Sequence, residues 1–198
     1  MVSRGSDITE KTRGGFADSP ATRHTRRVIR LATLATAAVL MLTACSQNAT
    51  TDPSAEPAND FCHAMATAAD LAPAAAEALD GLFTTMDAMA AGSTDGDIET
   101  LHTAGAATTS ASTTYADALG TAASLAPESL AVDITTLQEY WNLYAAGLGQ
   151  VATDASSYGK LVDETTALST SEQASSLVAN QPDAQQRIND GYLAECSG

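Results

Sequence analysis

The feature that most constrains the fold is the regular spacing of apolar residues in the alanine-rich segment that begins at Asp60. A helix has 3.6 residues per turn, so apolar residues at intervals of four and three form one continuous buried face. Pro73 lies inside the segment and predicts either a kink or a helix that ends near Leu71 and starts again at the proline. Gly92 to Asp95 then predicts a stop and a new helix start. The apolar positions are Phe61, Met65, Ala68, Ala72, Ala75, Leu79, Leu82, Met86 and Met89.

Three further segments carry the same kind of spacing. A second helix is predicted from about Asp95 to Ser124, and a third begins after Pro127, because proline is favoured at the first position of a helix. A fourth helix is predicted from about Ser171 onward, with Pro182 as a candidate break. The clearest apolar face is that of the third helix: Leu130, Ile134, Leu137, Trp141, Tyr144, Leu148 and Val151.

The fold class follows from these helices, because the sequence contains no alternating β-branched run of strand length. We expect an all-α domain over residues 60–198, arranged as an antiparallel up-down four-helix bundle. Turns near residues 93 and 126 would place Ser112 opposite Trp141 in such a bundle. Residues 158–168 are then expected to form a bent segment over the top, so that the last helix returns to the base.

Residues 1–44 have the pattern of an export signal that is removed. Basic residues between Arg23 and Arg30 precede the largely apolar residues 31–42, which make about 18 Å of helix at ~1.5 Å per residue. A membrane-spanning helix needs roughly 20 residues, so this run is too short to be a permanent anchor. It ends in Leu42-Thr43-Ala44-Cys45, which resembles the lipobox of bacterial lipoproteins.

The lipobox resemblance implies a processing step and a location. In bacterial lipoproteins the signal is cleaved just before the cysteine, whose thiol carries a diacylglyceryl group, so Cys45 would become the lipidated first residue. Two acyl chains anchor a protein stably, which implies a domain held at the extracytoplasmic face of the cell membrane. Residues 45–59 would form a flexible tether, because they contain Pro53 and Pro57 and no hydrophobic pattern. The alternative is an ordinary secretory signal with a chance cysteine.

Two details of the leader stay open. Thr25-Arg26-Arg27-Val28-Ile29 partly resembles the twin-arginine export motif, so this route and the general secretory route are both compatible with the sequence. Residues 1–22 show no periodicity, and they are either a long leader or lie upstream of the true start.

With Cys45 lipidated, Cys62 and Cys196 remain as a candidate disulfide pair. They lie at the start of the first helix and the end of the last, which share one end of an up-down bundle, and an exported compartment permits oxidation. The alternative is two free buried thiols. Phe61-Cys62 and the Cys196-Ser197-Gly198 ending also resemble those of small helical lipoproteins of high-GC Gram-positive bacteria, many of them without assigned function.

The charge of the chain is unevenly distributed. Residues 1–44 hold seven of the nine Lys and Arg residues and three of the 24 Asp and Glu residues. The rest of the chain therefore has Lys160 and Arg187 against 21 carboxylates, a net charge of −19. Such a surface repels nucleic acid and anionic lipid head groups, so no nucleic-acid partner is expected. The charge favours solubility, and attraction of cationic ligands is the alternative.

The sequence indicates no catalytic, metal or cofactor site. His24 lies in the leader, and His63 and His102 would lie near opposite ends of the bundle, so they cannot share a metal ion. Glu99-Thr100-Leu101-His102 has the Glu-x-x-His spacing of di-iron bundles, but a second copy is missing. The carboxylates of Asp95 to Glu99 are explained by their favourable interaction with a helix N-terminus. We therefore predict a non-enzymatic protein.

One group of side chains is a candidate ligand site. Tyrosine hydroxyls in a bundle interior, with the small polar residues Thr108 and Ser112 opposite, can hold a small amphipathic or cationic ligand. The alternative is a packed core, because most of the group lies on the apolar faces. The aromatic residues are Tyr115, Tyr140, Trp141 and Tyr144.

The function expected from these patterns is that of a membrane-anchored, extracytoplasmic lipoprotein that serves as a structural or interaction module of the cell envelope. Its partners would be the membrane, through the lipid on Cys45, and an envelope protein or the cell wall. The second hypothesis is a lipoprotein that binds a small molecule or cation with the aromatic group.

Overall fold

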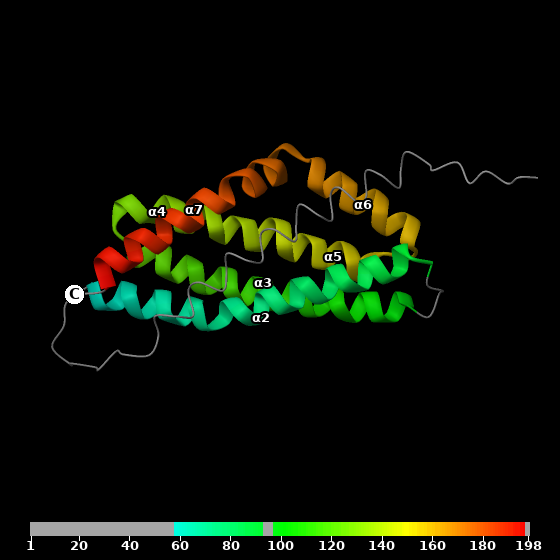
Figure 1. Ribbon diagram of the computed structural model, residues 1–198, viewed down its shortest axis with the longest axis horizontal. Helices are drawn as coiled ribbons and strands as arrows, with labels where there is room; N and C mark the ends of the chain where they lie inside the picture. The colour runs from blue at the N-terminus through cyan, green and yellow to red at the C-terminus, as the bar shows by residue number, and fades with distance from the viewer. Residues whose placement is uncertain (1–57, 93–96, 197–198) are drawn as a thin grey trace, which may run out of the picture.

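The computed structural model describes residues 58–92 and 97–196, which form helices and turns but no strand (Figure 1). This confirms the predicted all-α class. Residues 1–44, the lipobox cysteine Cys45 and the tether lie outside the described residues. In chain order the elements are α2 (Ala58–Ala90), α3 (Asp97–Leu125), α4 (Glu128–Glu139), the π-helix η2 (Tyr140–Ala145), α5 (Ala146–Asp154), α6 (Tyr158–Thr170) and α7 (Glu172–Cys196).

Helix α2 runs without a break through Pro73. A proline inside a helix removes one backbone hydrogen bond and crowds the carbonyl four residues earlier. Pro73 is exposed, whereas Ala72 and Ala75 are fully buried, so the face that packs on the core continues past the proline. The structure therefore excludes a helix that ends near Leu71 and restarts. Pro182 is likewise exposed inside continuous α7, so the candidate break there is wrong.

The third helix contains a π-helical turn, η2, between α4 and α5. The turn is wider than an α-helical one, and it ends where the Ala146 N–H donates to the Trp141 carbonyl five residues earlier. The extra residue rotates the buried face of the helix. The face predicted to reach Val151 reaches Ala152 instead, which is fully buried while Val151 is only partly buried. One inserted residue changes the apolar spacing so little that the sequence pattern did not reveal it.

Neighbouring helices pack along their lengths (Figure 1). Helix α2 packs on α3, and α3 packs on α4, η2 and α5, while α7 contacts both α4 and α2. Gly92 ends the α2 segment with φ 106°, a left-handed conformation that glycine adopts without steric cost. Ala126 and Pro127 separate α3 from α4. The buried apolar side chains of these helices form one core cluster.

The segment expected to bend over the top is instead the regular helix α6, which packs on α5. The bend lies at Ser171, between α6 and α7 (Figure 1). Helices α6 and α7 have 13 and 25 residues, or about 57 Å at ~1.5 Å per residue. Residues 128–154 span only about 40 Å by the same measure. The returning chain is therefore longer than the helix it follows, and the bend accommodates the excess.

Two links hold α7 against the other helices. The disulfide between Cys62 and Cys196, with Cα atoms 5.8 Å apart, joins the start of α2 to the end of α7 and confirms the predicted pair. Arg187 of α7 donates through Nη2 and Nε to the two carboxylate oxygens of Asp133 of α4, at 2.7 and 2.9 Å. A two-pronged pair of this kind favours one relative orientation of the two side chains, so it adds a directional contact between α7 and α4.

Candidate functional site

The structure brings the four predicted aromatic residues together in the protein interior. Tyr115 comes from α3, and Tyr140, Trp141 and Tyr144 come from the π-helix η2. The ring centroids of Tyr115 and Trp141 are 5.2 Å apart at 69°, and those of Tyr140 and Trp141 are 5.6 Å apart at 89°. Tyr140 and Tyr144 follow at 5.5 Å. The two contacts of Trp141 are edge contacts, a favourable packing geometry, and none of the four residues is more than 6% exposed.

Burial changes the acidity of these phenols. Desolvation raises the pKa of Tyr115 and Tyr140 above the ordinary value, and the neighbouring Tyr144 adds to the effect at Tyr140. The pKa of Tyr144 is also raised by burial, although a hydrogen bond with Ser169 opposes that shift. The three phenols are therefore neutral at physiological pH.

The polar groups beside the aromatic residues fall into two sets. Thr108 donates to the carbonyls of Ala78 and Ala104, both at 2.9 Å, so its hydroxyl is satisfied. By contrast, Ser112 Oγ, Tyr115 OH and Trp141 Nε1 are buried and have no hydrogen-bond partner among the described residues. Buried polar atoms without partners are uncommon in folded proteins, and each one calls for a physical explanation.

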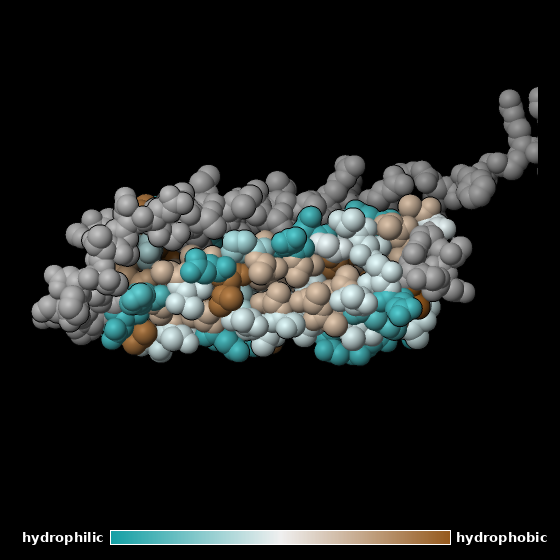
Figure 2. Space-filling view, turned by 90° about the horizontal axis from the view of Figure 1, so that it is seen from below, coloured by the Kyte–Doolittle hydropathy of each residue, from teal (hydrophilic) through white to brown (hydrophobic). Residues whose placement is uncertain are grey.

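A second candidate site is a groove on the outer side of α2 and α3, which we call the α2/α3 groove. Its volume is about 570 Å³. Viewed from below, weakly hydrophobic atoms run along this face of the molecule, interrupted by hydrophilic patches (Figure 2). The residues that line the groove are Ala78, Gly81, Thr85, Glu99, Thr100, Thr103, Ala104 and Ala107.

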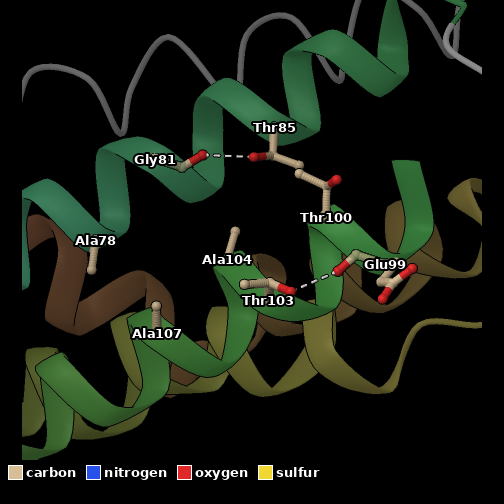
Figure 3. Close-up of a pocket in the computed structure, with 8 residues that line it drawn as sticks. All are labelled: Ala78, Gly81, Thr85, Glu99, Thr100, Thr103, Ala104 and Ala107. Carbon is tan, nitrogen blue, oxygen red and sulfur yellow. Dashed lines mark hydrogen bonds between the residues drawn. The ribbon is translucent and has the colours of Figure 1, made fainter. Parts of the chain in front are cut away.

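Two of the threonines that line the α2/α3 groove use their hydroxyls in hydrogen bonds within their own helices. Thr85 donates to the Gly81 carbonyl and Thr103 donates to the Glu99 carbonyl, each at 2.9 Å within its own helix (Figure 3). Their hydroxyls are thus partly occupied by the backbone, and the alanines of the lining add methyl groups. Glu99 is exposed and is the one acidic residue of the lining.

The sequence analysis missed the α2/α3 groove, although a signal was present. Ala78, Gly81 and Thr85 recur at intervals of three and four on α2, and so do Thr100, Thr103 and Ala107 on α3. This spacing places small residues on one face of each helix. Their positions differ from the strongly apolar faces, and the predicted buried faces include none of them.

The two histidines of the described residues lie apart in the fold. His63 is exposed on α2, and His102 Nε2 of α3 lies 2.8 Å from the Ala155 carbonyl, just beyond the end of α5. Within residues 58–92 and 97–196, no group of three or more His, Cys, Asp or Glu residues could hold a metal ion. His102 thus contacts the residue that follows α5, and Glu99, three residues before His102, lines the α2/α3 groove.

Comparison of the chain with protein-family models, with curated proteins and with solved structures finds no match. In the part of the chain that the structure describes, no helix is both long enough and apolar enough to cross a membrane.

Proposed function

We propose that this chain is a membrane-anchored lipoprotein of the cell envelope whose domain, residues 60–198, is an antiparallel four-helix bundle that binds another envelope protein. The contacts among α2, α3, α4 and α7, and the disulfide between the first and last helices, support the bundle. The lipobox-like Leu42-Thr43-Ala44-Cys45 supports a lipid anchor on Cys45 at the extracytoplasmic face. The observation that carries a binding function rather than catalysis is the α2/α3 groove.

The small residues that line the α2/α3 groove would let a third helix approach closely. Packed helices lie about 8–10 Å apart, at a distance that depends on the side chains at the contact, so small side chains allow a close approach. Ala78, Gly81 and Ala107 supply small side chains on both sides of the groove. An amphipathic helix binds such a groove by inserting apolar side chains spaced three and four residues apart.

The charge of the domain selects the kind of helix. From Cys45 onward the chain has 21 carboxylates against Lys160 and Arg187, and Glu99 lies in the groove lining itself. Complementary charge steers association and suppresses wrong partners. The partner is therefore a helix with an apolar ridge flanked by lysine or arginine. A second copy of this chain would bring the same strong negative charge, which disfavours self-association.

A binding experiment with a designed probe tests the groove. The probe is a synthetic helical peptide with leucines spaced three and four residues apart and lysines on its other face. We expect it to shift the amide resonances of groove residues in α2 and α3. Gly81→Leu should abolish these shifts, because the new side chain fills the groove. A Cβ at Gly81 meets nothing within 4 Å, so the variant is expected to fold normally.

Two controls separate groove binding from general attraction to an acidic surface. Ala179→Leu adds a leucine at an exposed position of α7, and it should leave peptide binding unchanged. A peptide with glutamates in place of lysines should bind much more weakly. Shifts that spread over the whole acidic surface and survive Gly81→Leu would refute the proposed groove function.

The anchor has a test of its own. Mass spectrometry of the protein from its native envelope should find Cys45 as the first residue, carrying two or more acyl chains. Cys45→Ser should release the protein from the membrane fraction. A mature protein that begins elsewhere, or an unmodified Cys45, would contradict the lipoprotein proposal while leaving the groove untouched.

The second hypothesis, a small-molecule or cation carrier that uses Tyr115, Tyr140, Trp141 and Tyr144, is less well supported. These side chains fill the interior by packing on one another, and the α2/α3 groove lies elsewhere. Native mass spectrometry tests this hypothesis directly. A mass excess that disappears on unfolding would favour a bound ligand and would move the carrier function ahead of docking.

A further inference from the structure

The unpartnered polar atoms of the aromatic core belong to residues that sit together. Tyr115 and Trp141 are in edge contact, with ring centroids 5.2 Å apart. Ser112 lies one turn before Tyr115 on α3, and a long side chain in a helix leans back over the preceding turn. Tyr115 therefore extends over the turn that carries Ser112. Ser112 and Tyr115 are 0% exposed and Trp141 is 2% exposed, so bulk water does not reach any of them.

These three atoms also make no hydrogen bond to the backbone of their own helices. A serine inside a helix often donates to the carbonyl four residues earlier, as Thr114 does to Ser110 at 2.8 Å. Ser112 makes no such bond within the described residues. The Tyr115 hydroxyl and the Trp141 indole N–H also have no hydrogen-bond partner there. A buried donor or acceptor that loses its bonds to water and gains none in return is strongly unfavourable. A shared hydrogen-bonding partner removes this cost for all of them.

The chemistry of the three groups selects that partner. The indole N–H is only a donor, whereas the hydroxyls of Ser112 and Tyr115 both donate and accept. An anion would satisfy three donors, but it would be buried without a countercharge, because Arg187 is already paired with Asp133. A cation would face the positive edge of the indole at its N–H. A small neutral molecule that both donates and accepts fits all three groups.

We infer that Ser112 Oγ, Tyr115 OH and Trp141 Nε1 form a binding site for internal water, one or two molecules held between α3 and the π-helix η2. A single buried water needs little more than its own volume and two to four polar partners, and these three groups supply such a set. Ser112 is the smallest of the three residues, and its short side chain would leave the space. The water would satisfy the Trp141 indole N–H, which the π turn carries, together with the hydroxyls of Ser112 and Tyr115 on α3.

A high-resolution crystal structure of the oxidised domain tests the inference directly. We expect density for water within hydrogen-bonding distance of at least two of the three atoms. Direct bonds from these atoms to protein groups, with no water between them, would overturn the inference. Density for a larger molecule at the same atoms would overturn it too, and would instead favour the carrier function.

A solution experiment uses the fact that the chain has one tryptophan. Its indole N–H gives a single nuclear magnetic resonance signal, and we expect that signal to receive magnetisation from a long-lived bound water. Exchanging hydroxyl protons of Ser112 or Tyr115 could relay the same transfer, so Ser112→Ala and Tyr115→Phe are measured separately. Each variant retains two partners for the water, and the transfer should persist in both.

A matched control leaves the three atoms in place. Tyr144→Phe removes a phenol that bonds to Ser169, so it should not change the transfer from water to the indole N–H. Absence of any transfer in the unmodified domain would refute a water site. Its loss in Ser112→Ala or Tyr115→Phe would refute the site too, and would assign the signal to the hydroxyl protons.

Discussion

Gly105 of α3 and Gly149 of α5 face each other where the two helices cross. A Cβ placed on Gly105 would lie 2.6 Å from the Gly149 carbonyl oxygen, and one placed on Gly149 would lie 2.6 Å from the Gly105 carbonyl oxygen. Thr109 and Thr153 flank the contact, and Thr109 Oγ1 donates across it to the Ala146 carbonyl at 3.3 Å. The absence of two side chains thus lets the backbones of α3 and α5 touch.

This close crossing predicts that Gly149→Ala destabilises the domain. The added methyl group must push the helices apart, and overpacking of this kind costs about 1–3 kcal/mol in unfolding free energy. Gly81→Ala is the matched control, because its Cβ meets nothing within 4 Å and alanine is favoured over glycine in a helix by up to ~1 kcal/mol. Denaturant unfolding measures both. Equal stability of the two variants would disprove the tight crossing.

The Cys62–Cys196 disulfide should supply a large part of the stability. It closes a loop with a sequence separation of 134, and the chain-entropy model assigns such a loop about 5 kcal/mol. We expect the doubly substituted Cys62→Ser, Cys196→Ser domain to unfold at much lower denaturant concentration than the oxidised domain. The reduced unmodified domain should behave like the variant. A domain whose stability is indifferent to reduction would show that helix packing alone holds the two ends together.

Trp141 should be a major core residue. It is 2% exposed and packs against both Tyr115 and Tyr140, so Trp141→Ala is expected to lower the unfolding free energy by about 3–5 kcal/mol. Leu143 lies on the same π turn but is 41% exposed, and Leu143→Ala should cost far less. Thermal unfolding of the two variants gives the comparison. Similar losses would mean that the indole is not buried as described.

The buried tyrosines should make the domain sensitive to alkaline pH. The folded-state pKa of Tyr115 and Tyr140 is raised by burial, so the folded state retains phenolic protons that the unfolded state releases near pH 10. Stability is therefore complete below about pH 10 and falls as pH rises above it. We expect phenolate absorbance of these residues to appear together with loss of helical circular dichroism. Ionisation of all five tyrosines in a still-folded domain would contradict this.

The sequence was sufficient to predict the long helices and the Cys62–Cys196 disulfide, because the apolar spacing and the positions of the cysteines at helix ends can be read directly from it. The spacing of Phe61 to Met89 reports which face of a helix is buried, whatever it packs against. Cys62 and Cys196 lie at helix ends, so their pairing followed from chain direction. The aromatic group was also predicted as a cluster, because counting residues from the turns shows which positions of neighbouring helices lie side by side. The lipid anchor on Cys45 and the binding function stay predictions.

What the sequence by itself determined is the all-α class, the approximate starts of the long helices and the residues of the aromatic core. Only the tertiary structure decided the π turn at Tyr140–Ala145, the bend at Ser171, the contact of Gly105 with Gly149 and the α2/α3 groove. The physical reason is that periodicity records whether a side chain avoids water. It does not record how closely two backbones approach, or which small residues leave a surface hollow, because those depend on the distances between helices.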